Sequence, residues 1–278
     1  MLFRRYLKPF SERLIAIFRD YPLPDFLIIG AQKCGTTSLY AYLMQHPGIL
    51  QPKTKEIHYF ERTKNYSRGD AWYRRHFPSE SLRKSWKIKL GYSPITGEAT
   101  PCMEHPNVPK LVHELLPNVK LIVLLRNPVD RAFSQYHHNR KVPGREPLTF
   151  EEAIAESAKT LSHEEPKDER RLGQPKRRNY LIRGLYAEHL EYWFKYYPEE
   201  SLHIVNSKEF FADPGSEVKR VLRFLEMPDF NIDCSVPRHV GDYDTHMSQK
   251  MRECLEDFYR PHNRKLYELT QKNFGWPS

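Results

Sequence analysis

The feature that most constrains this chain is an apolar run that leads into a glycine-bounded loop and then a helix. The run DFLIIG ends at Gly30 and predicts a short buried strand. Four residues separate Gly30 from Gly35, and the hydroxyl residues Thr36, Thr37 and Ser38 open a helical stretch that stops at the tripeptide HPG. Strand, loop and helix in this order form half of a βαβ unit, which predicts a parallel sheet.

Later segments repeat this order of elements. Residues 119–125 are almost continuously apolar, as in a strand buried on both faces of a parallel sheet, and a helix is predicted from Pro128 to about Arg140. The run SLHIVN predicts another short strand, with an aromatic helix before it at 184–197 and an amphipathic helix after it at 214–227. The alternation predicts a three-layer α/β/α fold around a central, mainly parallel sheet.

Composition and charge patterning suggest one globular domain with a short leading segment. The 278 residues are 39% hydrophobic and 13% aromatic. We expect residues 1–23 to form a basic amphipathic segment that packs as a surface helix, with transient contact with an acidic membrane as the alternative, and residues 24–278 to form a single domain. The polar stretch 157–180 predicts a long surface connection. Because we find neither an apolar window of membrane-spanning length nor a signal-peptide core, we expect a cytoplasmic protein without a transmembrane segment.

The net charge and the cysteines limit the classes of ligand. A net charge of +9 favours an anionic partner without choosing between nucleic acid, acidic polysaccharide and an anionic cofactor. The four cysteines include no CxxC pair, so we expect reduced thiols and no metal, while a disulfide between Cys234 and Cys254 stays open.

The glycine-bounded loop predicts a site for a tetrahedral anion. Its backbone amides, the helix N-terminus and the hydroxyls that follow are suitable donors, and the loop lies where a strand ends. A nucleotide triphosphatase places a lysine after the second glycine, but here Thr36 follows Gly35 and the only lysine, Lys33, lies inside the loop. A lone match of this kind is equally consistent with a tight turn.

The second strand–helix junction carries another pair of anion ligands. Arg126 follows the apolar strand, and Ser134 lies eight residues later, about two helical turns on. An arginine and a hydroxyl that converge suit a phosphate monoester. Alone, the pair is an ordinary capping arginine and a helical serine; together with the first loop, it suggests a nucleotide with two separate phosphate groups.

Three ordered motifs make the chain resemble the sulfotransferases that use 3′-phosphoadenosine 5′-phosphosulfate (PAPS), in particular the heparan-sulfate-type carbohydrate sulfotransferases and their bacterial relatives. The motifs are PDFLIIGAQKCGTTSLYAYLMQHP, KEIHYFE and LIVLLRNPVDRAFSQYHH, and the resemblance runs from about Pro24 to Trp276. It implies a P-loop-like nucleotide-binding fold and transfer of a sulfuryl group to a hydroxyl or amine, with a glycan as acceptor, by in-line displacement and without a metal.

The resemblance also assigns the donor site. It implies that Lys33 contacts the oxygen between phosphate and sulfur and stabilises the leaving phosphate, while Arg126 and Ser134 hold the 3′-phosphate. Arg238 comes from a late loop whose pattern departs from that of the family's animal members. The full predicted donor-binding set is Gln32, Lys33, Cys34, Gly35, Thr36, Thr37, Ser38, Arg126, Ser134 and Arg238.

On the acceptor side, the resemblance implies that Glu56 is the general base and that His58 is a supporting or competing base. The two lie two residues apart, so on a strand they would face the same side. Lys55 and Glu98 are predicted to bind the acceptor, with contact to the base as the alternative for Glu98. Ala99 stands where the heparan-type enzymes have a lysine, so fine substrate specificity does not carry over.

Other functions stay open at this point. Sulfation of a lipid, a small metabolite or a carrier-bound hydroxyacyl group would use the same chemistry. A P-loop kinase or triphosphatase is a different class, against which the missing lysine after Gly35 and the arginine at the end of the second strand argue. A non-catalytic polyanion-binding protein is supported only by net charge, and nucleic acid is not an expected partner. The acceptor and the oligomeric state are not determined.

Overall fold

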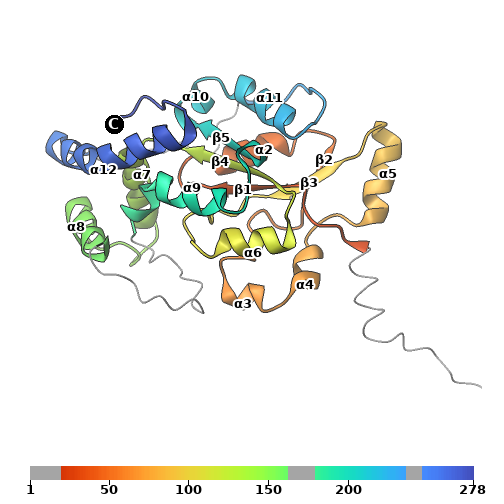
Figure 1. Cartoon of the computed structure of the whole chain (residues 1–278), viewed down its shortest axis with the longest axis horizontal. Coiled ribbons are helices and arrows are strands. Elements are labelled where there is room, and N and C mark those ends of the chain that lie inside the picture. The colour runs from red at the N-terminus through yellow and green to blue at the C-terminus, as the bar shows by residue number, and fades with distance from the viewer. Residues whose placement is uncertain (1–19, 162–178, 236–245) are drawn as a thin grey trace, which may run out of the picture.

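A computed structural model describes residues 20–161, 179–235 and 246–278 (Figure 1). Its centre is a five-stranded sheet in the order β2-β3-β1-β4-β5, with every neighbouring pair parallel. The prediction of an α/β/α fold around a parallel sheet is therefore confirmed. The strands are β1 (Phe26–Gly30), β2 (Ile49–Leu50), β3 (Ile95–Glu98), β4 (Lys120–Leu125) and β5 (Leu202–Asn206).

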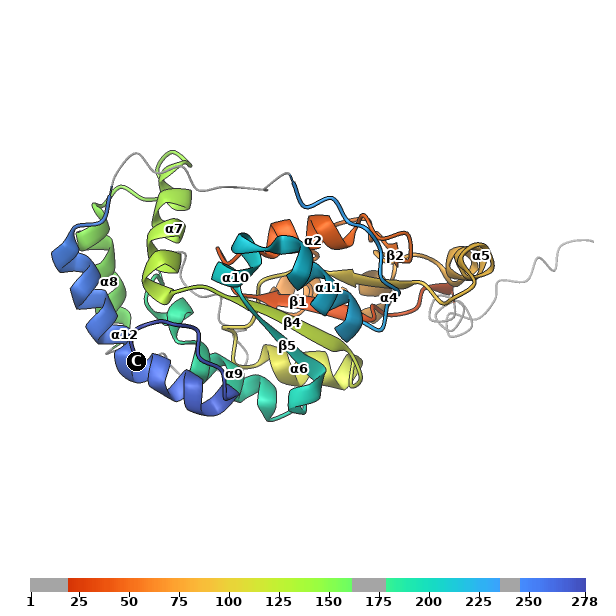
Figure 2. The same ribbon diagram turned by 90° about the horizontal axis from the view of Figure 1, so that it is seen from above.

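The two central strands carry the apolar runs that the sequence predicts. All of β1 is buried, as is β4 after its first residue, and Ile28 lies opposite Ile122 in their shared register. Helices cover both faces of the sheet, with α2, α10 and α11 on one side and α6 and α9 on the other (Figures 1 and 2). Burial on both faces explains why these strands are continuously apolar and not alternating.

The predicted helices form close to their expected ends. The helix after β4 begins at Pro128, and the Asn127 side chain accepts a hydrogen bond from the Val129 N–H at 2.9 Å, which caps its first turn. The helices are α2 (Thr36–Leu43), α3 (Thr63–Tyr66), α4 (Asp70–Arg74), α5 (Glu80–Leu90), α6 (Val108–Leu115), α7 (Pro128–Arg140), α8 (Phe150–Leu161), α9 (Tyr186–Phe194), α10 (Ser207–Ala212), α11 (Pro214–Phe224) and α12 (Gln249–Thr270).

The predicted surface connection at 157–180 is wrong at both ends. Ser157 belongs to α8, is buried, and accepts a hydrogen bond from the Leu181 N–H at 3.0 Å. Tyr180 is fully buried, and its hydroxyl lies 2.5 Å from Glu146 Oε2. These ends pack because α8 has its own apolar face, which joins a second core cluster beside α7 and α12.

Two sequence predictions fall mainly on residues outside the described ranges. Residues 162–178 are the middle of the predicted surface connection, and residues 1–19 are most of the basic amphipathic segment. Within the described ranges, no helix combines the length and the apolar character needed to cross a membrane.

Candidate active site

The loop between β1 and α2 has a backbone that presents N–H groups to an anion. Lys33 and Gly35 both adopt left-handed conformations, with φ of 71° and 101°. Gly35 is the N-cap of α2 and brings no side chain to that end of the helix, so the first N–H groups face the loop. The left-handed conformation favours glycine, and a Cβ on Gly35 would also lie 2.9 Å from the tip of the Phe211 ring.

Cations gather around this loop. Burial of the Lys33 ammonium lowers its pKa, and the nearby charges of Arg126 and Lys141 lower it further. Arg126 at the end of β4 and Lys141 at the end of α7 therefore lie close enough to repel the Lys33 ammonium. An anion placed among them would relieve that repulsion, so these residues fit a donor that carries phosphate and sulfate groups.

Side chains behind the loop fix its position. The Ser207 hydroxyl donates to the Cys34 carbonyl at 2.7 Å, and the Tyr186 hydroxyl donates to the Arg126 carbonyl at 2.9 Å. Burial raises the pKa of the Cys34 thiol, so it stays protonated as a packed residue and not a nucleophile. Side chains of α10 and α9 thus bond to the backbone carbonyls of the loop and of the residue that follows β4.

Gln32 is held by a buried ion pair. Arg183 is bonded to the Gln32 side-chain oxygen and lies 3.2 Å from Glu104, and both charged side chains are largely buried. The sequence singled out neither Arg183 nor Glu104, because they lie 79 residues apart and only the folded chain brings them together.

The two predicted ligands of the 3′-phosphate lie on the strand–helix unit formed by β4 and α7. Arg126 follows β4 directly, and Ser134 is a buried residue of α7. Arg238 lies outside the described residues, so its predicted role stays a prediction.

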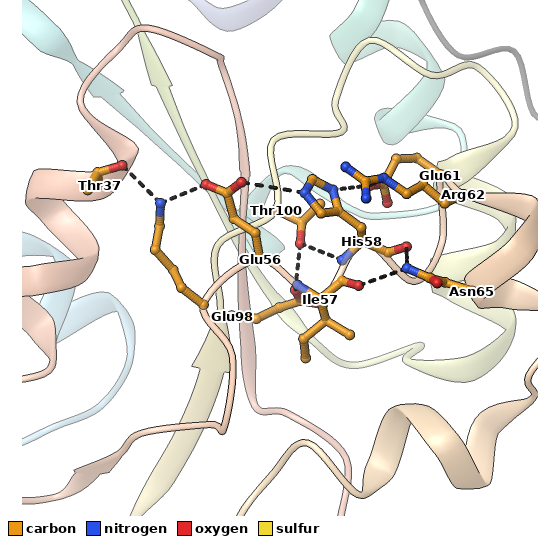
Figure 3. Close-up of polar contacts among 10 residues, drawn as sticks. Thr37, Glu56, Ile57, His58, Glu61, Arg62, Asn65, Glu98 and Thr100 are labelled. Carbon is orange, nitrogen blue, oxygen red and sulfur yellow. Dashed lines mark hydrogen bonds and ion pairs between the residues drawn. The ribbon is translucent and has the colours of Figure 1, made fainter.

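A chain of polar contacts joins α2, the helix that follows the glycine-bounded loop, to the predicted base Glu56 (Figure 3). The Lys55 ammonium donates to Thr37 Oγ1 at 2.9 Å and to Glu56 Oε1 at 2.7 Å. The other carboxylate oxygen of Glu56 lies 3.5 Å from His58 Nε2. On the far side of the ring, His58 Nδ1 lies 2.5 Å from Glu61 Oε1. Lys55, Glu56 and His58, predicted from one short motif, therefore form one contact chain, and its Lys55 end bonds to Thr37.

The expectation that Glu56 and His58 share one face of a strand is wrong. Residues 51–60 form no strand, and His58 has a left-handed backbone with φ of 57°. The side chains still meet, because this irregular backbone turns the imidazole towards the carboxylate.

The contact chain sets the charges of the predicted base and its neighbour. The hydrogen bond from His58 lowers the pKa of Glu56 to about 2, against the effect of burial and together with Lys55. Burial lowers the pKa of His58, but the bonds to Glu56 and Glu61 outweigh it and raise the pKa to about 9. At neutral pH the pair is a carboxylate beside an imidazolium, so Glu56 is the group able to accept a proton.

Glu98 does not lie where the predicted acceptor contact would need it. Its side chain is only 2% exposed. The Tyr73 hydroxyl donates to Oε1 at 2.8 Å, while the Ile57 N–H at 3.0 Å and the Thr100 hydroxyl at 2.6 Å donate to Oε2. Glu98 therefore lies beneath the acceptor loop (residues 51–61), and its carboxylate accepts a hydrogen bond from the backbone of that loop. Sequence reasoning missed this arrangement because residues 57, 73 and 98 meet only in the folded chain.

Two further residues of the site were absent from the predicted set. Glu61 belongs to the KEIHYFE motif, and its spacing of three from His58 was the available signal. Lys141 directly follows the predicted helix at Arg140, and only the folded chain brings it near Lys33.

Cys234 and Cys254 are both free thiols. Among the described residues, no group of three or more histidine, cysteine, aspartate or glutamate side chains is arranged to hold a metal ion.

A cation-lined glycine loop that Lys55 connects to a carboxylate–imidazole pair suits group transfer from an anionic donor. The protein-family model for the sulfotransferase domain matches residues 23–270, so this chain belongs to the sulfotransferase family. The predicted family and enzyme class are thereby confirmed, and the kinase and simple polyanion-binding alternatives are set aside.

Several curated relatives are about 30% identical to the chain over the aligned residues. Human heparan sulfate glucosamine 3-O-sulfotransferase 6 is 32% identical over 91% of this chain and 73% of its own length. The bifunctional heparan sulfate N-deacetylase/N-sulfotransferase of Drosophila melanogaster is 32% identical over 90% of this chain, which spans 26% of that protein. The membrane-associated sulfotransferase kil1 of Dictyostelium discoideum is 29% identical over 91% of this chain, which spans 66% of kil1.

A solved structure supports the same fold. The sulfotransferase from Alicyclobacillus acidocaldarius superposes with a TM-score of 0.68 at 29% identity, over 91% of this chain and 97% of that one. The similarity therefore covers nearly all of both chains.

Proposed function

We propose that this chain transfers a sulfuryl group from PAPS to a hydroxyl, or an amine, of a glycan by in-line displacement. The observation that carries the proposal is the contact chain from Thr37 through Lys55 to Glu56, which connects a carboxylate to the donor loop through one lysine. The heparan sulfate enzymes among the relatives support a glycan acceptor. The donor, when bound, supplies the activated sulfuryl group.

On the donor side, the chain contributes positive charge and backbone N–H groups. The amides of residues 33–38 and the start of α2 hold the phosphosulfate. Lys33 stabilises the negative charge that grows on the leaving phosphate, and burial strengthens this interaction because little water competes. Arg126 and Ser134 bind the 3′-phosphate at the β4–α7 junction.

On the acceptor side, Glu56 accepts the proton of the attacking hydroxyl as the new oxygen–sulfur bond forms. Its low pKa in the free protein makes it a weak base, because Lys55 and His58 both stabilise the carboxylate. His58, itself fixed by Glu61, orients the carboxylate and keeps it ionised before the acceptor arrives. Lys55 joins the two halves of the site and keeps the base close to the donor.

Ligand-induced thermal shift tests the donor assignment. Adenosine 3′,5′-bisphosphate without magnesium should raise the Tm by roughly 5 °C or more at a hundredfold excess over Kd, because it binds only the folded state. Lys33→Ala should reduce the shift, whereas Lys110→Ala, on the exposed side of α6, should not. Equal stabilisation of both variants by ATP–magnesium, with none by the bisphosphate, would refute the proposal.

The acceptor is tested by chemistry. The protein is incubated with sulfur-labelled PAPS and a panel of glycans, lipids and small alcohols, and the products are analysed by mass spectrometry. Label on a glycan hydroxyl or amine supports the proposal. Label only on a lipid or a small alcohol would keep the reaction class and reject the acceptor.

A further inference from the structure

We propose that Glu98 is a positioning residue that sets the geometry of the Glu56–His58 pair by holding the backbone between them. This inference rests on the proposed function, because it assigns a role within the same site. Glu98 reaches neither donor nor acceptor, since its side chain is buried beneath the loop. It acts through the backbone N–H groups of Ile57 and His58.

The two N–H groups are held by one carboxylate. Glu98 Oε2 accepts directly from the Ile57 N–H at 3.0 Å. The same oxygen accepts from the Thr100 hydroxyl at 2.6 Å, and Thr100 in turn accepts from the His58 N–H at 3.3 Å (Figure 3). One oxygen atom therefore restrains two consecutive peptide groups, one directly and one through a threonine.

The carbonyl groups of the same two residues are restrained by Asn65. Its amide nitrogen donates to the carbonyl of Ile57 at 3.2 Å and to that of His58 at 3.0 Å. The Ala99 N–H donates to the Lys55 carbonyl at 3.1 Å, which aligns the segment after β3 with the acceptor loop. The loop is thus clamped from both sides by residues outside it.

This clamp matters because the loop has no strand ladder of its own. His58 adopts a left-handed conformation that is unfavourable for a residue with a Cβ, and such conformations persist only when their surroundings impose them. If the restraint on the two N–H groups were lost, the backbone of His58 could relax. Its ring would then turn away from Glu56.

The surroundings of Glu98 agree with a structural role. Tyr73 donates to it from α4 and stacks on Tyr59 with 4.5 Å between ring centroids. Tyr40, Cys102 and Glu61 are the other titratable groups whose charges interact with Glu98. Burial raises the pKa of Glu98 to about 7, although the bonds from Thr100, Ile57 and Tyr73 lower it. A neutral amide is therefore a close mimic of the protonated form present near neutral pH.

Two substitutions separate positioning from charge. Glu98→Gln keeps an oxygen for Ile57 and Thr100, and its NH₂ can donate to the hydroxyl oxygen of Tyr73, so kcat should stay within about threefold of the wild type. Glu98→Met has a similar shape without oxygen acceptors. Its kcat should fall on the order of 10²-fold, the loss expected for a misplacement of about 1 Å. The KM for the donor should not change, because the donor loop is untouched.

A matched control removes another buried carboxylate. Glu217→Met, on α11, breaks bonds to His203 and Arg220 away from the site and should leave kcat at the wild-type value. Circular dichroism and thermal melts establish that each variant is folded. If Glu98→Met does not fold, Thr100→Val takes its place, because it removes only the bridge to the His58 N–H, and its kcat should fall roughly tenfold.

The titration of His58 gives a readout that does not depend on activity. Its pKa, about 9 in the wild-type protein, should fall in Glu98→Met or Thr100→Val as the ring leaves Glu56, because one of the two carboxylates that raise it is lost, and should be retained in Glu98→Gln. Histidine side-chain NMR measures it, with the signal assigned by comparison with His58→Gln. If the wild-type protein is inactive but His58 titrates as described, the proposed function is refuted and the positioning role of Glu98 is not.

Three results would overturn the proposal. One is a wild-type kcat and an unchanged His58 pKa in the folded Glu98→Met or Thr100→Val variant. Another is a loss in Glu98→Gln as large as in Glu98→Met, which would assign the effect to charge. The third is a donor KM that changes as much as kcat, which would place Glu98 in donor binding.

Discussion

The donor loop (residues 30–38) and the acceptor loop (residues 51–61) lie in contact but are built in different ways. The donor loop connects β1 directly to α2, and its shape follows from a glycine with φ of 101° and from the helix that begins there. The acceptor loop has no regular secondary structure between Gln51 and Phe60. Side chains of Glu98, Thr100 and Asn65, which come from elsewhere in the chain, hold it instead.

Because the two loops are built differently, substitutions in each of them should affect different steps of the reaction. Changes to the backbone of the donor loop should weaken donor binding, because the ligand is held by that backbone. Changes around the acceptor loop should slow turnover and leave donor binding intact. The Lys55–Thr37 hydrogen bond of 2.9 Å is the place where the two halves meet.

The largest effect is expected at Glu56. Glu56→Gln should retain the affinity for adenosine 3′,5′-bisphosphate but lose about 10²–10⁴-fold in kcat, because a general base contributes that much. Calorimetry measures the binding and labelled PAPS measures the turnover. Full turnover in this variant would move the base role to His58 and break the division between the two loops.

The next effect is on stability at Glu98, within the acceptor half. The pKa of Glu98 is about 7 in the folded protein, above its ordinary value of 4.5, so the folded state binds the proton more tightly. Its contribution is therefore fully present below pH 4.5 and is lost as the pH rises through 7. Glu98→Gln cannot lose a proton, so at pH 8 it should be more stable than the wild type by at most about 3 kcal/mol.

Thermal melts at pH 5 and pH 8 check this expectation. The Tm advantage of Glu98→Gln should be clear at pH 8 and small at pH 5. An advantage of equal size at both values would show that it does not come from the ionisation of Glu98.

A smaller effect is expected in the donor loop at Gly35. Gly35→Ala forces a Cβ into a left-handed conformation and to within 2.9 Å of the Phe211 ring, so donor affinity should fall about tenfold, with a stability loss of about 1–2 kcal/mol. Calorimetry with the bisphosphate measures the affinity. Adding Phe211→Ala removes the clash and leaves the backbone strain, so full recovery in the double variant would contradict the importance of the backbone conformation.

The smallest effect is the pH dependence of stability at Glu56. Its pKa of about 2 lies below the ordinary 4.5, because His58 and Lys55 stabilise the carboxylate. The stability it contributes is present above pH 4.5 and is lost as the pH falls through 2. Glu56→Gln should therefore lower the Tm slightly at pH 7, opposite in sign to Glu98→Gln, with a smaller difference at pH 4. A higher Tm at pH 7 would show that the carboxylate is not stabilised by its neighbours.

Much of the fold was predictable from sequence because its signals are local. Apolar runs identified β1 and β4, and a proline identified the start of α7. The predicted ends of these elements lie close to the observed ones. The short strand β3 was not predicted, because the run ITGE lacks a periodic pattern. The ends of the 157–180 stretch were misjudged, since the packing of Ser157 and Tyr180 depends on residues distant in sequence.

By itself, the sequence determined the donor loop, the parallel sheet and the motif that carries Glu56 and His58. Each of these is encoded within a few consecutive residues, where backbone preference and hydrophobic pattern act directly. Only the tertiary structure decided that Lys55 bonds to Thr37, that Lys141 comes near Lys33 and that Glu98 supports the acceptor loop from beneath. The physical reason is that buried polar groups must find partners, and those partners are chosen by how the whole chain packs.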